Sequence, residues 1–161
     1  MKKKKVFFFC TSIGMFCFIA GIYSTLRMSV KRLADYKSLS DKHRELFFLM
    51  CRWVKVKQEG KSVASYLEAR NIREVAVYGM NHVGMSLINE LEGTGIKVAY
   101  GIDQHVDKPF TDVKIFRPED MPGKVDAVVV TAVTYFDEIK QMLNEQVSCP
   151  VISLEDMVYG I

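Results

Sequence analysis

The chain begins with a basic N-terminus followed by a long apolar run. Residues 6–26, VFFFCTSIGMFCFIAGIYSTL, contain no charged side chain, and about 20 apolar residues suffice for a helix to span the hydrocarbon core of a bilayer. Four lysines precede the run, as in a signal peptide, but the run exceeds the ~7–15 apolar residues usual there and no small-residue cleavage motif follows. The pattern therefore predicts a transmembrane anchor over residues 1–27, with a cleaved signal peptide as the alternative.

Residues 28–71 show helical spacing and predict an amphipathic helical linker. Ser38–Asp41 reads SLSD, a capping box, so we expect a second helix to start there and to end near Gly60, followed by a short helix over 62–69. The apolar face should pack on a second copy of the chain, on the following domain or along the membrane surface. The apolar positions are Val30, Leu33, Leu39, Leu46, Phe47, Met50, Trp53 and Val54.

Residues 72–161 alternate apolar runs of strand length with helical stretches. The expected strands cover 74–79, 96–103, 113–116, 126–133 and 149–154, and the expected helical segments cover 85–94, 118–121, 135–145 and 155–160. Continuous apolar runs such as Val128–Val130 indicate a sheet that is buried on both faces. The pattern predicts an α/β fold with a five-stranded parallel Rossmann-like sheet in the order 3-2-1-4-5.

Charge divides the chain into two parts. Of its 22 Lys and Arg residues and 19 Asp and Glu residues, residues 1–60 hold 13 and 4, and residues 61–161 hold 9 and 15. The basic arm indicates membrane lipid as a partner, and the acidic part excludes a nucleic-acid footprint. Basic residues flank both sides of the apolar run, so they do not orient it. A nucleotide-binding type of domain favours a single-pass protein of the cell membrane with its globular part in the cytoplasm.

The loop after the first strand carries the clearest motif. Residues 77–87, VYGMNHVGMSL, lie where dinucleotide-binding proteins place G-x-G-x-x-G. Gly79 and Gly84 match the glycines for the tight turn and for close helix packing, but Asn81 replaces the middle glycine. Asparagine tolerates left-handed backbone angles, although its side chain would stand where a phosphate oxygen should come. The loop thus leaves open whether it binds a phosphate or only maintains the fold.

Further side chains should gather at the same edge of the sheet. Asp103, 24 residues after Gly79, is placed to accept ribose hydroxyls or is an ordinary strand-end aspartate, and His82 and His105 either contact a phosphate or are solvated. Thr131 follows the fourth strand. NAD(P) and a nucleotide-sugar are the candidate ligands. The candidate ligand-binding residues are Gly79, Asn81, His82, Gly84, Asp103 and Thr131.

Neither a metal site nor catalysis by this chain alone is expected. The segment DQHVD, residues 103–107, has metal-binding residue types but no matching second cluster, and Cys51 and Cys149 lack paired spacing. Tyr135 and Lys140 resemble the Tyr-x-x-x-Lys pair of short-chain dehydrogenases, but Ile139 occupies the lysine position. A Ser/His/Asp set and a Walker A sequence are also absent from the sequence.

The segments VAVYGMNHVG, VAYGID and VVVTAV…CPVISLEDM together resemble Rossmann-like, nucleotide- or CoA-binding-type domains of bacterial capsule and lipopolysaccharide biosynthesis proteins. Examples are the N-terminal domains of sugar O-acyltransferases and of membrane-bound nucleotide-sugar dehydratase/epimerases. The resemblance covers residues 72–158 and implies Gly79, Gly84 and Asp103 as ligand contacts.

Three functional hypotheses follow from the residues and the resemblance. The first is a membrane-anchored accessory or regulatory protein of surface-polysaccharide biosynthesis that binds a nucleotide or nucleotide-sugar. The second is a non-catalytic scaffold with a vestigial nucleotide site, whose residues 28–57 form a homodimer or recruit a glycosyltransferase or another enzyme of the pathway. The third is a nucleotide-sugar oxidoreductase or epimerase that depends on a partner for its catalytic residues.

Overall fold

A computed structural model describes the backbone of residues 2–105 and 112–161, with side chains described from residue 21 onward. The chain divides between Arg44 and Glu45 into two compact units. Among the residues whose side chains the structure describes, no helix is long and apolar enough to cross a membrane. Residues 6–20 of the predicted anchor lie outside the part of the chain whose side chains are described.

One continuous helix, α1 (Lys2–Gln58), replaces the two helices expected before Gly60. The prediction that Ser38–Asp41 starts a second helix is wrong, because these residues lie in the interior of α1. Neither Gly nor Pro occurs from residue 22 to residue 59, so nothing in this stretch interrupts the i to i−4 hydrogen bonds. The predicted end is confirmed, since Gly60 follows with a φ of +73°.

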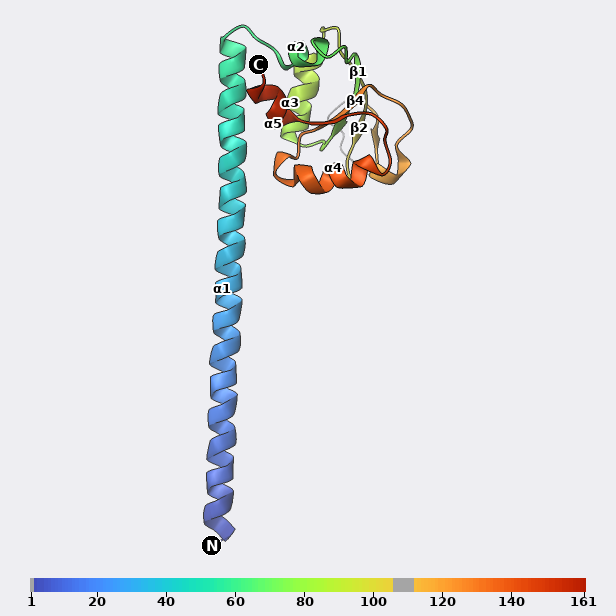
Figure 1. Ribbon diagram of the computed structural model, residues 1–161. Helices are drawn as coiled ribbons and strands as arrows, with labels where there is room; N and C mark the ends of the chain where they lie inside the picture. Colours follow the sequence, from blue (N-terminus) through green and yellow to red (C-terminus); the bar gives the residue numbers. More distant parts are fainter. Residues whose placement is uncertain (1, 106–111) are drawn as a thin grey trace. The chain divides into compact units, whose positions relative to one another are not determined.

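The second unit is built on a five-stranded parallel sheet in the order β3-β2-β1-β4-β5 (Figure 1), which confirms the predicted topology. The edge strands β3 and β5 are short, with two and three residues. The strands are β1 (Glu74–Tyr78), β2 (Lys97–Ile102), β3 (Ile115–Phe116), β4 (Ala127–Val130) and β5 (Val151–Ser153).

Helices cover both faces of this sheet (Figure 1). Side chains alternate along β1, so that Val75 and Val77 pack with one helical layer while Ala76 and Tyr78 pack with the other. The first layer contains α2 (Val63–Glu68), α3 (His82–Leu91), α5 (Leu154–Tyr159) and the last turns of α1. The second contains α4 (Phe136–Asn144), and the short 3₁₀ helices η1 (Pro118–Asp120) and η2 (Val133–Tyr135) connect strands.

The last turns of α1 belong to the core of the second unit. Leu49, Trp53 and Val56 are 2%, 4% and 0% exposed and pack with the first helical layer. The apolar face of residues 28–71 was expected to pack on a second copy, on the following domain or along the membrane. For Leu49, Trp53 and Val56 the covering surface is the domain. Phe47 and Phe48, by contrast, remain 63% and 55% exposed. The segment after Glu45 therefore has a face that the domain covers and a face that it does not.

Candidate functional site

The glycine loop lies at the carboxyl end of β1, beside β4, where the order of the strands reverses. Gly79 has a φ of +94°, and a Cβ atom there would lie 2.8 Å from Oγ1 of Thr131. A Cβ atom on Gly84 would lie only 2.2 Å from the carbonyl oxygen of Gly79. The two glycines therefore serve a tight turn and the close approach of α3 to that turn.

Asn81 caps the N-terminus of α3 instead of entering the left-handed region. Its φ is −96° and its ψ is −169°, which is extended backbone, so the tolerance of asparagine for left-handed angles is not used here, because Gly79 makes the turn with a φ of +94°. The Oδ1 atom of Asn81 accepts hydrogen bonds from the backbone N–H groups of Val83 at 2.9 Å and of Gly84 at 3.2 Å. These are the groups that a helix N-terminus offers to an anion.

Asp103 also directs its carboxylate at the loop. Its Oδ2 atom accepts a hydrogen bond from the backbone N–H of Met80 at 2.8 Å, and its Oδ1 atom accepts one from the backbone N–H of His105 at 2.9 Å. The side chain is only 13% exposed. Asp103 thus has both oxygens in contact with backbone donors of the chain, in the manner of a strand-end aspartate that closes a turn.

Thr131 completes the contacts of the loop. Its side chain is 1% exposed, and its hydroxyl donates to the carbonyl oxygens of Gly79 at 2.7 Å and Tyr78 at 3.0 Å. His82, the first residue of α3, is exposed, and the side chain of His105 is 85% exposed. The structure therefore brings the predicted residues to one edge, where three side chains contact the backbone of the loop and the two histidines are exposed.

Tyr78 and Lys140 both lie near this edge, at the end of β1 and in α4. Burial raises the pKa of Tyr78, and the charge of Asp103 acts in the same direction against a hydrogen bond with Gln104. Tyr78 therefore remains a neutral phenol at physiological pH. Lys140 lies with Nζ 5.3 Å from the ring centroid of Phe136, while Ile139 packs into the second layer. That position thus carries a core side chain in place of the lysine of a Tyr-x-x-x-Lys pair.

A hollow of about 340 Å³ lies beyond the carboxyl ends of β4 and β5. Four carboxylates line it, from Asp137, Glu138, Glu155 and Asp156, in the first turns of α4 and α5 where negative charge stabilises a helix. This charge disfavours a phosphate on the β4 side. Within residues 2–105 and 112–161, no group of three or more His, Cys, Asp or Glu side chains could hold a metal ion, and Asp107 of DQHVD lies outside that part.

A second hollow, of about 770 Å³, lies at the opposite edge, before β4 and β5. Its lining includes Glu119, Lys124 and Cys149. Burial raises the pKa of the Cys149 thiol, which keeps it protonated and a weak nucleophile. This hollow therefore lacks an activated group.

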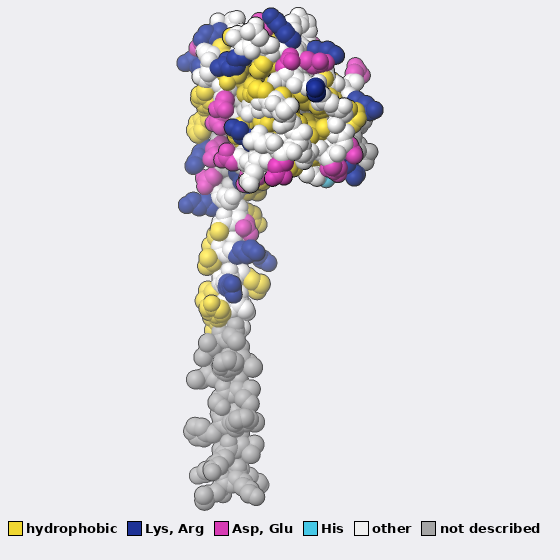
Figure 2. Space-filling model, turned by 45° about the vertical axis from the view of Figure 1, so that its right-hand side comes forward, with side chains coloured by type: hydrophobic (Ala, Val, Ile, Leu, Met, Phe, Trp, Pro, Cys, Tyr) yellow, Lys and Arg dark blue, Asp and Glu magenta, His cyan; other side chains and the backbone are white. Residues whose placement is uncertain are grey.

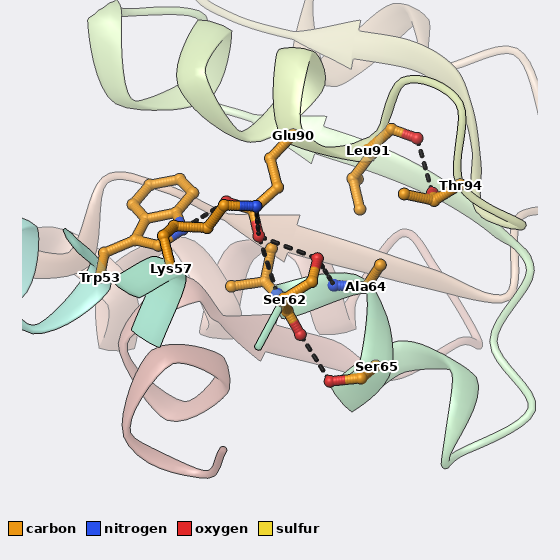
Figure 3. Close-up of polar contacts among 9 residues, drawn as sticks. Trp53, Lys57, Ser62, Ala64, Ser65, Glu90, Leu91 and Thr94 are labelled. Carbon is orange, nitrogen blue, oxygen red and sulfur yellow. Dashed lines mark hydrogen bonds and ion pairs between the residues drawn. The ribbon is translucent and has the colours of Figure 1, made fainter. Parts of the chain in front are cut away.

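The sequence interpretation missed Glu90, the centre of the polar cluster in Figure 3. The Oε2 atom of Glu90 accepts a 2.6 Å hydrogen bond from the indole N–H of Trp53, and Oε1 accepts bonds from the Ser62 hydroxyl at 3.0 Å and the Val63 N–H at 2.9 Å. Lys57 Nζ lies 3.4 Å from Oε1, and the Glu90 side chain is 7% exposed. The available signal was the single tryptophan, because a buried indole N–H requires an acceptor.

No model of a protein family, no curated protein and no solved structure matches this chain.

Proposed function

We propose that this chain is a membrane-anchored, non-catalytic docking module whose Rossmann-like domain keeps its phosphate loop closed. The observation that carries the proposal is that the loop's own side chains occupy its N–H groups. Asn81 accepts from Val83 and Gly84, and Asp103 accepts from Met80. A phosphate would need the same donors. The domain therefore offers a surface to a partner in place of a nucleotide site.

The hydrogen bonds of Asn81 and Asp103 are strong enough to disfavour a phosphate in the loop. A neutral hydrogen bond contributes about 0.5–1.5 kcal/mol net, and a bond to a charged group about 1.5–3 kcal/mol. A nucleotide that displaced both Asn81 and Asp103 would lose on the order of 3–5 kcal/mol of affinity. That loss corresponds to a dissociation constant weaker by about a hundredfold to a few thousandfold.

The predicted anchor, the basic arm and the family resemblance together suggest where the protein acts and in which pathway. An anchor over residues 6–26, followed by a basic stretch, suits an anionic cytoplasmic leaflet and a cytoplasmic domain. The resemblance to domains of capsule and lipopolysaccharide biosynthesis proteins suggests an accessory role in surface-polysaccharide biosynthesis. A glycosyltransferase or another enzyme of that pathway is then the partner to be held at the membrane.

Thermal unfolding of the full chain in detergent micelles tests the proposal, with NAD, NADP, CoA, ATP and UDP-, GDP- and dTDP-sugars as probes. A ligand at 100 times its Kd adds about 2.7 kcal/mol, roughly 10 °C in midpoint for a domain of this size. We expect wild-type shifts of about 1 °C or less, and a large shift with any probe overturns the closed loop. Asn81→Gly frees the backbone N–H groups of Val83 and Gly84. It should cost little stability, because glycine is tolerated at an N-cap.

A second candidate function keeps the site in use as a nucleotide or nucleotide-sugar site. The observation that favours it is the gathering of Gly79, Asn81, Asp103 and Thr131 at the carboxyl edge between β1 and β4, where ligands bind in Rossmann-like sheets. It predicts a wild-type shift with one probe and its loss in Asp103→Ala. A shift that Asp103→Ala leaves unchanged would place the ligand elsewhere.

A further inference from the structure

The helix α3 connects the glycine loop with the last turns of α1. At its N-terminus, Oδ1 of Asn81 accepts hydrogen bonds from the backbone N–H groups of Val83 and Gly84. Near its C-terminus, Glu90 extends toward α1 and accepts the indole N–H of Trp53 at 2.6 Å (Figure 3). The helix has ten residues, which span about 15 Å at a rise of 1.5 Å per residue. A single short element therefore reaches from the candidate site to α1.

The contact between α3 and the glycine loop is too close to allow relative movement. A Cβ atom on Gly84 would overlap the carbonyl oxygen of Gly79, and the hydroxyl of Thr131 donates to that same oxygen at 2.7 Å. Met80, the next residue of the loop, is buried in the same apolar cluster as Leu87 of α3. A displacement of α3 therefore moves the loop, because a close-packed interior leaves no space for one to shift without the other.

The other end of α3 is attached to α1 through buried groups. Trp53 belongs to the same buried cluster as Ile88 and Leu91 of α3, and the Glu90 side chain that holds its indole N–H is only 7% exposed. A helix of ten residues is marginal in water by itself, so α3 depends on its attachments at both ends. Loss of the attachment at one end weakens the helix as a whole.

Ion pairs at the surface contribute little to this attachment. Figure 2 shows Lys and Arg side chains interspersed with Asp and Glu side chains on one face of the second unit, and exposed pairs of this kind stabilise a protein only weakly. The side chain of Lys57, whose Nζ lies 3.4 Å from Oε1 of Glu90, is itself 51% exposed. Solvent therefore screens its charge, and the buried bond from Trp53 is what holds α1 to α3.

We propose that the seating of Trp53 on Glu90 keeps the glycine loop closed, with α3 as the element that couples the two. The proposal rests on the closed loop proposed above and names its regulation, with Trp53 and Glu90 as positioning residues. When the last turns of α1 separate from the domain, α3 loses its attachment at Glu90, and the hold of Asn81 on the first N–H groups of the helix weakens. Those donors then become available to an anionic group.

Amide hydrogen exchange of the full chain in detergent micelles, followed by NMR, tests the coupling. Trp53→Phe removes the indole donor and keeps an aromatic ring. The amides of Val83 and Gly84 should then exchange about tenfold faster, after correction for any rise at Val129 of the central strand β4, which reports global unfolding. Lys57→Met removes only the exposed partner of the same carboxylate and should leave exchange unchanged. No corrected rise in Trp53→Phe, or an equal rise in Lys57→Met, overturns the proposal.

The effect should also run in the opposite direction, because coupling between two sites is reciprocal. Trp53 is the single tryptophan of the chain, so its fluorescence reports on the far end of α3. Asn81→Ala should raise the constant for acrylamide quenching about twofold, whereas Asn81→Asp keeps the cap and should leave it unchanged. Equal quenching in Asn81→Ala and wild type contradicts the coupling. Both measurements are made without nucleotide, so failure of the coupling is distinguishable from failure of the closed loop, which nucleotide-induced shifts in midpoint test.

Discussion

The indole N–H of Trp53 lies 2.6 Å from Oε2 of Glu90 and joins the last turns of α1 to α3. Glu90 also accepts bonds from the start of α2 through Ser62 and Val63. A single carboxylate thus holds three helices of the first layer together. Since Trp53 is 4% exposed, loss of this acceptor leaves a buried donor without a partner.

We expect Glu90→Ala to destabilise the second unit by about 3 kcal/mol, because removal of one partner from a buried charged cluster exposes the others to the full desolvation cost. Urea unfolding of the full chain in detergent, followed by tryptophan fluorescence, measures this change. Glu90→Gln keeps an acceptor for Trp53 and should cost about half as much. Equal stability of Glu90→Ala and wild type would contradict the central role of this carboxylate.

Replacement of Asn81 by Ala should cost about 1–2 kcal/mol of stability, because α3 then loses its N-cap. Asn81→Asp retains an acceptor at the same place and should be at least as stable as wild type, since a carboxylate also suits the helix N-terminus. Urea midpoints of the two variants provide the comparison. A smaller loss for Ala than for Asp would show that the cap does not matter.

Gly84→Ala should destabilise the domain by about 3 kcal/mol or more, because its Cβ would lie 2.2 Å from the carbonyl oxygen of Gly79 and backbone must move. Gly123 is a matched control, since a Cβ atom there meets nothing within 4 Å. We expect Gly123→Ala to change stability by less than about 0.5 kcal/mol. Thermal midpoints that fall equally in both variants would refute the close packing of α3.

Asp126 should make the stability of the domain depend on pH in the acid range. Hydrogen bonds from the backbone N–H groups of Arg73 and Glu74 lower its pKa. A lowered folded-state pKa contributes stability that is present above the unfolded value of about 3.9 and is lost as pH falls through the folded value. Urea midpoints measured between about pH 2 and 6 should therefore fall less steeply with acid in Asp126→Asn than in wild type.

The two described cysteines should differ in reactivity. Burial raises the pKa of Cys149, whereas Cys51 is exposed on α1. Maleimide should therefore modify Cys51 well before Cys149 in the native chain at neutral pH. Mass spectrometry of peptides after timed labelling gives both rates, and a variant with Cys51→Ser should lose the fast phase. Comparable rates at both sites would contradict the packing around Cys149.

The strands and their order were predictable because they depend on local pattern. Apolar runs such as Val128–Val130 and their alternation with helices leave few topologies for the chain. The continuity of α1 was not predicted, because the capping box at Ser38–Asp41 is a local preference that a helix without Gly or Pro overrides. A capping-box sequence is thus weaker evidence for the start of a helix than a Gly or Pro that interrupts the helical pattern.

The candidate site was only partly predictable. The motif located Gly79, Gly84 and Asp103 at one edge, but the acceptor role of Asn81 depends on the direction of its side chain, which no spacing reveals. The Trp53 to Glu90 bond joins residues 37 positions apart, and nothing in either local segment indicates the other. Side-chain contacts between distant segments are therefore what the structure adds.

The short edge strands affect how readily the protein aggregates. With two residues in β3 and three in β5, the sheet presents few unpaired backbone groups to which another strand could add. Intermolecular growth of the sheet is thereby discouraged.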